Sequence, residues 1–285
     1  MLLIAGALAA SVAAANGAAA ACAPWRGWQD FNRLYVSGDG RVVDASTAQA
    51  VTVSEGQAYA LTFALIGNDP ASFAKILQWT RDNLAAGSLE HNLPAWRWGR
   101  SEGGKWGVLD ANAAADADLW IAYTLEQAAR LWHDAAYGEL ARSLAALIQR
   151  EEVALVPGLG ATLLPGPRGF VAQETWRLNA SYVPIQVLRG LAAREPRWSE
   201  VLDSARRTIV GSAPRGYAAD WVLYRQGGGF SADPSTVGVG SYNAIRVYLW
   251  AGMLASDDPQ AALLAQQLRP MAAAGAQGAP PESID

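Results

Sequence analysis

The fold is decided by residues 52–66, TVSEGQAYALTFALI. The strongly polar residues of this stretch lie in its first turn, and from Tyr59 to Ile66 it is apolar on almost every side of a helix. A helix on a protein surface normally keeps one polar face, whereas a helix that is apolar all round is buried on most sides. The stretch therefore predicts an inner helix of a large helical domain.

Two classes of helix alternate along the chain. Helices that are apolar almost all round are predicted at 59–66, 119–125, 182–191 and 244–255. Amphipathic helices with one apolar stripe are predicted around 73–83, 140–150 and 201–209, and another begins with Asp258 as N-cap. Long stretches rich in Gly, Pro and Trp separate them, at 86–110, 155–180 and 211–240. This alternation predicts an all-α barrel of two concentric layers, with the long loops forming a cleft at one end.

Composition limits the classes of function. Hydrophobic residues make up 51% of the 285 residues and charged residues 17%, so the chain can build a large core. The formal net charge is −4 and there is no long basic run, which argues against nucleic acid or an anionic membrane as the main partner. The 12 tryptophans include flat apolar faces suited to stacking on sugar rings.

The first residues resemble a secretory signal. No charged residue precedes Arg26, residues 2–12 form an apolar core, and Ala-rich cleavage sites follow up to Cys22. We expect a signal peptide at 1–22, a mature domain at 23–285, and a periplasmic or secreted protein without stable membrane insertion. Cys22 is the only cysteine, so an intrachain disulfide is excluded.

Glu55 is the first candidate for chemistry. Ser54 and Gln57 fit a capping box, which places Glu55 at the first position of a buried helix. The helix dipole alone favours a glutamate there. Because the helix is buried and Gly56 leaves space beside it, we expect the carboxyl group to point along a buried axis. A general acid needs a raised pKa, so apolar walls or a second carboxylate would have to outweigh the dipole.

Two further polar groups share this position in a buried helix. Asp116 and Asp118 lie in the first turn of the helix at 119–125, where we expect one to be the N-cap and the other functional. In SYNAIRVYLWAGM, residues 241–253, Ser241 is the expected N-cap and Asn243 lies in the first turn. If these helices are parallel neighbours, all three sites converge in one cleft.

The loops supply candidate substrate-binding residues. Aromatic candidates are Trp96, Trp98, Trp106 and Tyr182, and candidate hydrogen-bonding partners are Asp220 and Arg246. Each of these alone is more often structural than functional. Carboxylates combined with tryptophans are typical of glycoside hydrolases. The two histidines lack metal-ligand spacing, and no G-x-S-x-G, P-loop or dinucleotide motif is present, so we predict no metal and no cofactor.

The sequence resembles glycoside hydrolase family 8 from about Trp25 to the C-terminus. The motifs that carry the resemblance are DGRVVD, TVSEGQAYAL, PAWRWG, AADADLWIAYTL, LNASYVP, YAADWV and SYNAIRVYLWAGM, in the order of the family. The resemblance implies an (α/α)6 barrel and endo-acting hydrolysis of β-1,4-glucan with inversion. It makes Glu55 the general acid and associates Asp116 with the subsite at the cleavage point. It also implies a monomer and, in the cellulose-linked branch, a possible partner in the cellulose synthase export machinery.

Asn243 departs from the family pattern. In the cellulose-linked branch this position holds the aspartate that activates water, roughly 6.5–9.5 Å from the acid. An amide cannot accept the proton, so we expect impaired turnover. Three alternatives stay open: Glu174 or Asp233 serves as base, the asparagine was introduced to trap substrate, or the protein is a non-catalytic β-glucan-binding hydrolase. Chitosan hydrolysis is a further family activity, to which the slight net acidity gives little support.

The C-terminus is the second departure. Relatives continue beyond RPMAAAGAQGAPPESID, residues 269–285, through further helices that close the barrel. We therefore expect a barrel that is incomplete at the C-terminus. Such a barrel would expose apolar faces of the neighbouring helices, which favours low stability or aggregation.

Overall fold

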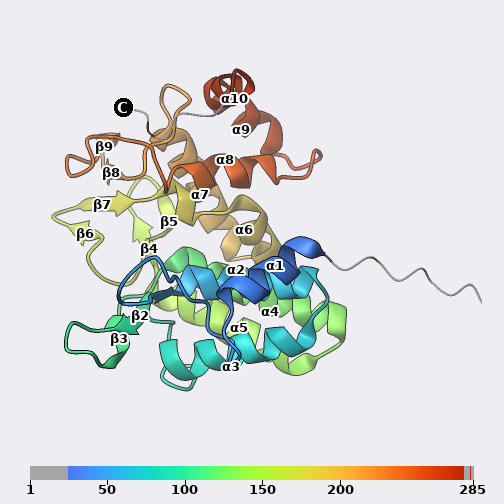
Figure 1. Cartoon of the computed structure of the whole chain (residues 1–285). Helices are drawn as coiled ribbons and strands as arrows, with labels where there is room; N and C mark the ends of the chain where they lie inside the picture. Colours follow the sequence, from blue (N-terminus) through green and yellow to red (C-terminus); the bar gives the residue numbers. More distant parts are fainter. Residues whose placement is uncertain (1–24, 279–282, 284–285) are drawn as a thin grey trace, which may run out of the picture.

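The computed structural model describes residues 25–278 and residue 283 (Figure 1). The predicted signal peptide at 1–22, including Cys22, lies outside the described residues. Within the described part, helices dominate and strands are short. No helix there is both long and apolar enough to span a membrane.

The helices form two layers, as the alternation in the sequence predicts (Figure 1). The inner helices are α2 (Ser54–Ile66), α4 (Ala115–Trp132), α6 (Ile185–Ala192) and α8 (Ile245–Gly252), and each packs against the next. The outer helices are α3 (Pro70–Leu84), α5 (Ala135–Glu151) and α7 (Trp198–Ser212), and each packs on the inner helix that precedes it. The remaining helices are α1 (Arg26–Tyr35), α9 (Ala261–Gln267) and α10 (Arg269–Ala276).

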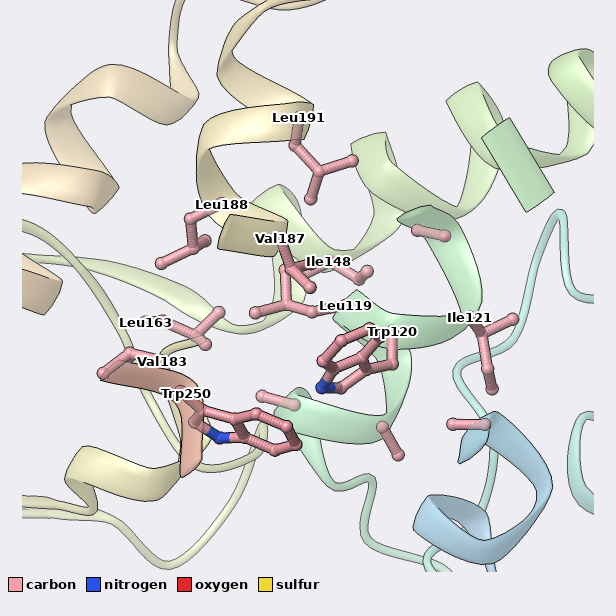
Figure 2. Packing of buried hydrophobic residues seen from close by; sticks show 14 of the residues in the cluster. Leu119, Trp120, Ile121, Ile148, Leu163, Val183, Val187, Leu188, Leu191 and Trp250 are labelled. Carbon is pink, nitrogen blue, oxygen red and sulfur yellow. The ribbon is translucent and has the colours of Figure 1, made fainter. Parts of the chain in front are cut away.

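The core explains why the inner helices lack a polar face. The α4 side chains Leu119 and Ile121 are fully buried, and residues on adjacent positions of the helix are buried too (Figure 2). Trp120 of α4 packs against Trp250 of α8 with ring centroids 5.3 Å apart. Val187 of α6 lies in the same cluster. Burying each such side chain contributes roughly 1.5–3 kcal/mol, so the inner helices are held by packing.

Most of the strands lie in the long stretches that were expected to be loops. The antiparallel sheets are β1–β2–β3 (Thr52–Val53, Arg97–Arg100, Trp106–Asp110), β4–β5 (Val153–Val156, Gly160–Leu163) and β6–β7–β8–β9 (Val171–Ala172, Thr175–Leu178, Val222–Arg225, Gly229–Ala232). The all-helical expectation therefore holds for the barrel but not for its connections. At the β8–β9 hairpin, Gly227 and Gly229 have φ of +72° and +70°, which glycine adopts without strain.

The predicted start of α9 is wrong. Asp258 was expected at the N-cap, but α9 begins at Ala261 after Gln260. Asp258 instead accepts two hydrogen bonds from Arg189, at 2.5 and 2.9 Å, and one from the Gln260 amide at 2.8 Å. The carboxylate thus ties α6 to the segment between α8 and α9, because a bidentate guanidinium contact is stronger than a single cap bond.

One face of α8 carries exposed apolar side chains. Ile245, Leu249 and Met253 are 60%, 52% and 52% exposed, and their spacing places them on one side of the helix; Tyr242, in the turn before α8, is 76% exposed. Exposed apolar faces are expected from the sequence in an incomplete barrel; that the barrel is incomplete stays a prediction.

Candidate active site

The N-terminal turn of α2 positions Glu55. The helix begins at Ser54, directly after β1, and its N-cap is Val53 without a side-chain cap. The predicted capping box is therefore wrong. The fully buried Gln57 side chain instead accepts from the Val42 amide at 2.6 Å and donates to Thr80 Oγ1 at 2.9 Å. Gln57 thus connects the loop at Val42 to α3, because a buried polar side chain needs partners within the protein.

The surroundings of Glu55 fit a general acid. Burial and the nearby Asp116 carboxyl raise the pKa of Glu55 to about 7, against the opposing effects of Arg246 and of the Trp96 indole N–H, which hydrogen-bonds to it. From the sequence, a raised pKa required apolar walls or a second carboxylate, and the structure has both a buried position and the Asp116 carboxyl group. At neutral pH a large fraction of Glu55 therefore holds a proton that it can donate.

Asp116 lies in the first turn of α4, and its partner is Arg246. The α4 N-cap is Ala114, so the expectation that Asp116 or Asp118 caps this helix is wrong. Asp116 Oδ2 accepts from Arg246 Nη1 at 2.6 Å and Oδ1 from the Ala117 amide at 2.9 Å. Burial raises the pKa of Asp116, while Arg246 and the Ala117 amide act in the opposite direction.

Asn243 is joined to Asp116 through the same guanidinium. Arg246 Nη2 donates to Asn243 Oδ1 at 2.7 Å. A guanidinium has only donors, so the amide oxygen of Asn243 must face it and the NH₂ group must face away. Asn243 lies in the turn before α8 rather than in its first helical turn, since the helix begins at Ile245. Burial alone would lower the pKa of Arg246, but Asp116, Tyr59 and Tyr182 raise it, so the guanidinium remains charged.

Asp220 holds the turn that carries Asn243. Its Oδ1 accepts from the amides of Ser241 and Ala244 at 2.9 and 2.7 Å, and its Oδ2 from Ser241 Oγ at 2.5 Å. Asp220 thus holds the turn before α8, and the expectation that Ser241 is the N-cap is wrong, because the N-cap is Ala244. The sequence proposed Asp220 as a partner of the substrate, and the structure gives its two oxygens these three bonds within the protein instead. No local signal reveals this, because the partners are 21 and 24 positions away.

Tyrosine rings line the cluster. The Arg246 guanidinium lies 5.4 Å from the ring centroid of Tyr182, the aromatic residue proposed from the sequence. Burial, followed by the charge of Asp116, raises the pKa of Tyr182 and of Tyr59. Tyr59 was missed by the sequence analysis, although its position four residues after Glu55 places both on one face of α2.

The three proposed tryptophans separate into two places. Trp96 adjoins Glu55 and is 36% exposed. Trp98 and Trp106 stack on each other on the β2–β3 hairpin, with centroids 5.4 Å apart. The Arg41 guanidinium lies 4.5 Å from the Trp98 centroid and 5.0 Å from that of Trp106. Much of the Trp98 ring is therefore engaged within the protein, whereas Trp106 is 52% exposed.

The two alternative bases differ sharply in their surroundings. Glu174 is exposed in the β6–β7 turn. Asp233 is 4% exposed, pairs with Arg177 at 2.6 Å and accepts from Ser235. Although burial acts to raise it, the pKa of Asp233 is lowered by Arg177 and Ser235. Neither carboxylate belongs to the cluster of Glu55, Asp116, Asn243 and Arg246. Among the described residues, no group of three or more His, Cys, Asp or Glu side chains could hold a metal ion.

Comparisons with known proteins identify the family of this chain. The sequence model of glycosyl hydrolases family 8 matches residues 2–285. An endoglucanase of Xanthomonas axonopodis pv. citri (strain 306) is 48% identical over 285 residues, which is 99% of this chain and 74% of that protein. An endoglucanase of Escherichia coli O157:H7 is 43% identical over 273 residues, 95% of this chain and 74% of that protein.

A solved structure has the same arrangement of helices. The crystal structure of endo-1,4-D-glucanase from Vibrio fischeri ES114 matches with a TM-score of 0.88 and 46% sequence identity, over 91% of this chain and 76% of that chain. Together with the family match, this likeness confirms the predicted (α/α)6 barrel fold.

Proposed function

This chain belongs to glycosyl hydrolases family 8, and on this premise we propose that it is an endo-acting β-1,4-glucanase whose base position carries an amide. Glu55 protonates the glycosidic oxygen of the leaving sugar. A water molecule attacks the anomeric carbon from the opposite face, so the configuration inverts. Asp116 contacts the sugar next to the cleavage point.

The observation that carries the proposal is the bridge from Asp116 through Arg246 to Asn243. The bridge turns the amide oxygen of Asn243 toward the guanidinium and leaves the NH₂ group for a water. An N–H donor holds a water by its oxygen and cannot accept its proton. An aspartate at 243 would bond Arg246 through one oxygen and keep the other for the water. The loss of general-base assistance lowers the rate by ~10²–10⁴-fold.

The surroundings of Glu174 and Asp233 argue against a substitute base. Glu174 lies on an exposed turn, and the Asp233 carboxylate is bonded to Arg177 and Ser235. Turnover is therefore slow, whereas binding of β-1,4-glucan does not require the base. A protein of this kind acts chiefly as a glucan clamp when its turnover is slower than chain release.

Export is part of the same proposal. The sequence of residues 1–22 favours a periplasmic or secreted enzyme that meets glucan chains as they leave the cellulose synthase export machinery. Fractionation of cells expressing the whole chain tests this. Cleaved protein in the periplasm or medium supports export, and intact protein retained in the cytoplasm contradicts it.

The test of the reaction is a slow hydrolysis followed by NMR. The chain is incubated at high concentration with a cello-oligosaccharide, and the anomer released first is read from its proton spectrum. We expect the α-anomer, slowly formed, and no product with Glu55→Gln. A β-anomer, or unchanged hydrolysis by Glu55→Gln, would overturn the assignment of an inverting mechanism with Glu55 as acid.

A further inference from the structure

Two carboxyl groups outside the proposed mechanism are completely buried. Asp118 lies in the first turn of α4, and Glu152 follows the last residue of α5. Both residues are 0% exposed. A buried carboxylate is costly unless a cation or hydrogen-bond donors compensate it. The pair therefore needs a physical explanation.

Neither group has a conventional partner. All four carboxyl oxygens lack a hydrogen bond from an N–H or O–H donor in the part of the chain described. The two side chains instead face each other within hydrogen-bonding range. Two ionised carboxylates cannot bond each other, because both are acceptors only. A hydrogen bond between the two side chains therefore requires a proton on one of them.

The charges around the pair disfavour ionisation of both carboxyl groups. The titratable groups that act on it are Glu55 from α2, Asp116 from α4 and Glu151 from α5, and all three are acidic. The cation of the active-site cluster, Arg246, is paired with Asp116. Burial and these neighbours raise the pKa of both Asp118 and Glu152, and the two titrate as a pair rather than singly.

Backbone hydrogen bonds connect the segment after Glu152 to the first turn of α4, which carries Asp116. The Glu152 carbonyl accepts from the Leu164 amide at 2.8 Å, and the carbonyl of the following Pro165 accepts from the Ala115 amide at 3.1 Å. Ala115 is the first residue of α4 and Asp116 is the second. Ala114, at the N-cap, has no side chain that can cap the helix.

We propose that Asp118 and Glu152 share a proton, and that this bond fastens the first turn of α4 to the end of α5 so that the pair positions Asp116. The importance of Asp116 for glucan rests on the proposed function, whereas the shared proton does not. When the pair loses its proton at high pH, two adjacent carboxylates repel each other. The first turn of α4 then shifts, and the ion pair of Asp116 with Arg246 weakens.

The test follows both residues in the whole chain by NMR, without substrate. Carboxyl carbons of Asp and Glu are labelled for titration, and the guanidinium nitrogens of Arg246 report on its pair with Asp116. We expect two carboxyl signals that titrate together, far above the range of exposed carboxyl groups, and Arg246 signals that shift over the same pH range. Glu55→Gln removes the separate signal of Glu55 and serves to assign it.

The matched variant is Glu152→Gln. Its amide donates to the Asp118 carboxylate without a shared proton, so Asp118 should titrate at lower pH and the high-pH shift of Arg246 should disappear. Should Glu152→Gln fail to fold, Asp118→Asn tests the same bond from the other side. If both carboxyl groups titrate in the range of exposed carboxyl groups, the shared proton is overturned. If the Arg246 signals do not shift over the pH range in which the pair titrates, the positioning role is overturned. Neither readout needs turnover, so failure of the glucanase proposal would be seen separately in hydrolysis assays.

Discussion

Arg246 Nη2 lies 2.7 Å from Asn243 Oδ1, so the guanidinium fixes which end of the amide faces the protein. The other terminal nitrogen of the same guanidinium bonds Asp116 at 2.6 Å. The residue at the base position is therefore held by a donor, in the way that an aspartate would be held. The difference is the group that remains free to bond a water molecule: asparagine presents an N–H donor, where aspartate would present a carboxylate oxygen.

The residual hydrolysis should depend on pH through Glu55. Because burial and Asp116 raise the pKa of Glu55 to about 7, the acid is protonated below that value. The rate should be level at low pH and fall about tenfold per pH unit above about 7. Initial rates on a soluble β-1,4-glucan between pH 5 and 9 measure this, and a rate that rises through pH 7 would exclude Glu55 as the acid.

Trp96 should have two separable effects. Trp96→Phe keeps an aromatic ring but removes the indole N–H that lowers the pKa of Glu55, so the fall in rate should move to higher pH. Trp96→Ala also removes the stacking surface and should weaken oligosaccharide binding roughly 10-fold, about 1.4 kcal/mol. Calorimetric affinities distinguish the two variants. Unchanged affinity in Trp96→Ala would remove this residue from the sugar-binding surface.

Asp220→Ala should destabilise the fold. The change leaves the amides of Ser241 and Ala244 without their acceptor, which lowers the free energy of unfolding by roughly 2–4 kcal/mol. Urea denaturation measures the loss. The control is Asp257→Ala, an exposed carboxylate near the same end of the chain. Equal stability of the two variants would contradict the capping role.

Stability should fall as the pH rises. The folded pKa values of Glu55, Asp118 and Glu152 are raised above their unfolded values, so the folded state binds more protons. Their contribution is fully present below the unfolded values of 3.8–4.5 and is lost as the pH rises through the folded values, which for Glu55 is about 7. Urea midpoints between pH 4 and 9 test the slope. The double variant Asp118→Asn/Glu152→Gln should flatten it, and stability that increases over this range would contradict the assignment.

The sequence predicted the helices of the barrel better than the N-caps of those helices. Apolar residues on every side of 59–66 and 119–125 identify buried helices, because only burial tolerates that pattern. The caps failed because the partners come from far along the chain: Gln57 serves Val42 and Thr80, and Asp220 caps the turn before α8. Periodicity carries no information on such contacts.

The candidate site was predicted only in part, again because contacts between residues far apart in the chain leave no local pattern. Placing Glu55, Asp116 and Asn243 at the ends of inner helices predicted that they would meet, and Arg246 links the last two. The buried pair of Asp118 and Glu152 could not be foreseen. The short connection between α4 and α5 makes them antiparallel and brings the end of α5 to the start of α4. It does not indicate that the side chains of Asp118 and Glu152 point toward each other, because this depends on how the two helices pack.

The central claim is that Asn243 disables a glucanase that is otherwise assembled. Reducing-end release from a soluble β-1,4-glucan, compared between this chain and Asn243→Asp, tests it most directly, with Asn243→Ala as the control that restores no carboxylate. We expect Asn243→Asp to be ~10²–10⁴-fold faster and Asn243→Ala to be no faster than the unchanged chain. Equal rates for the unchanged chain and Asn243→Asp would contradict the claim, because another group would then be the base.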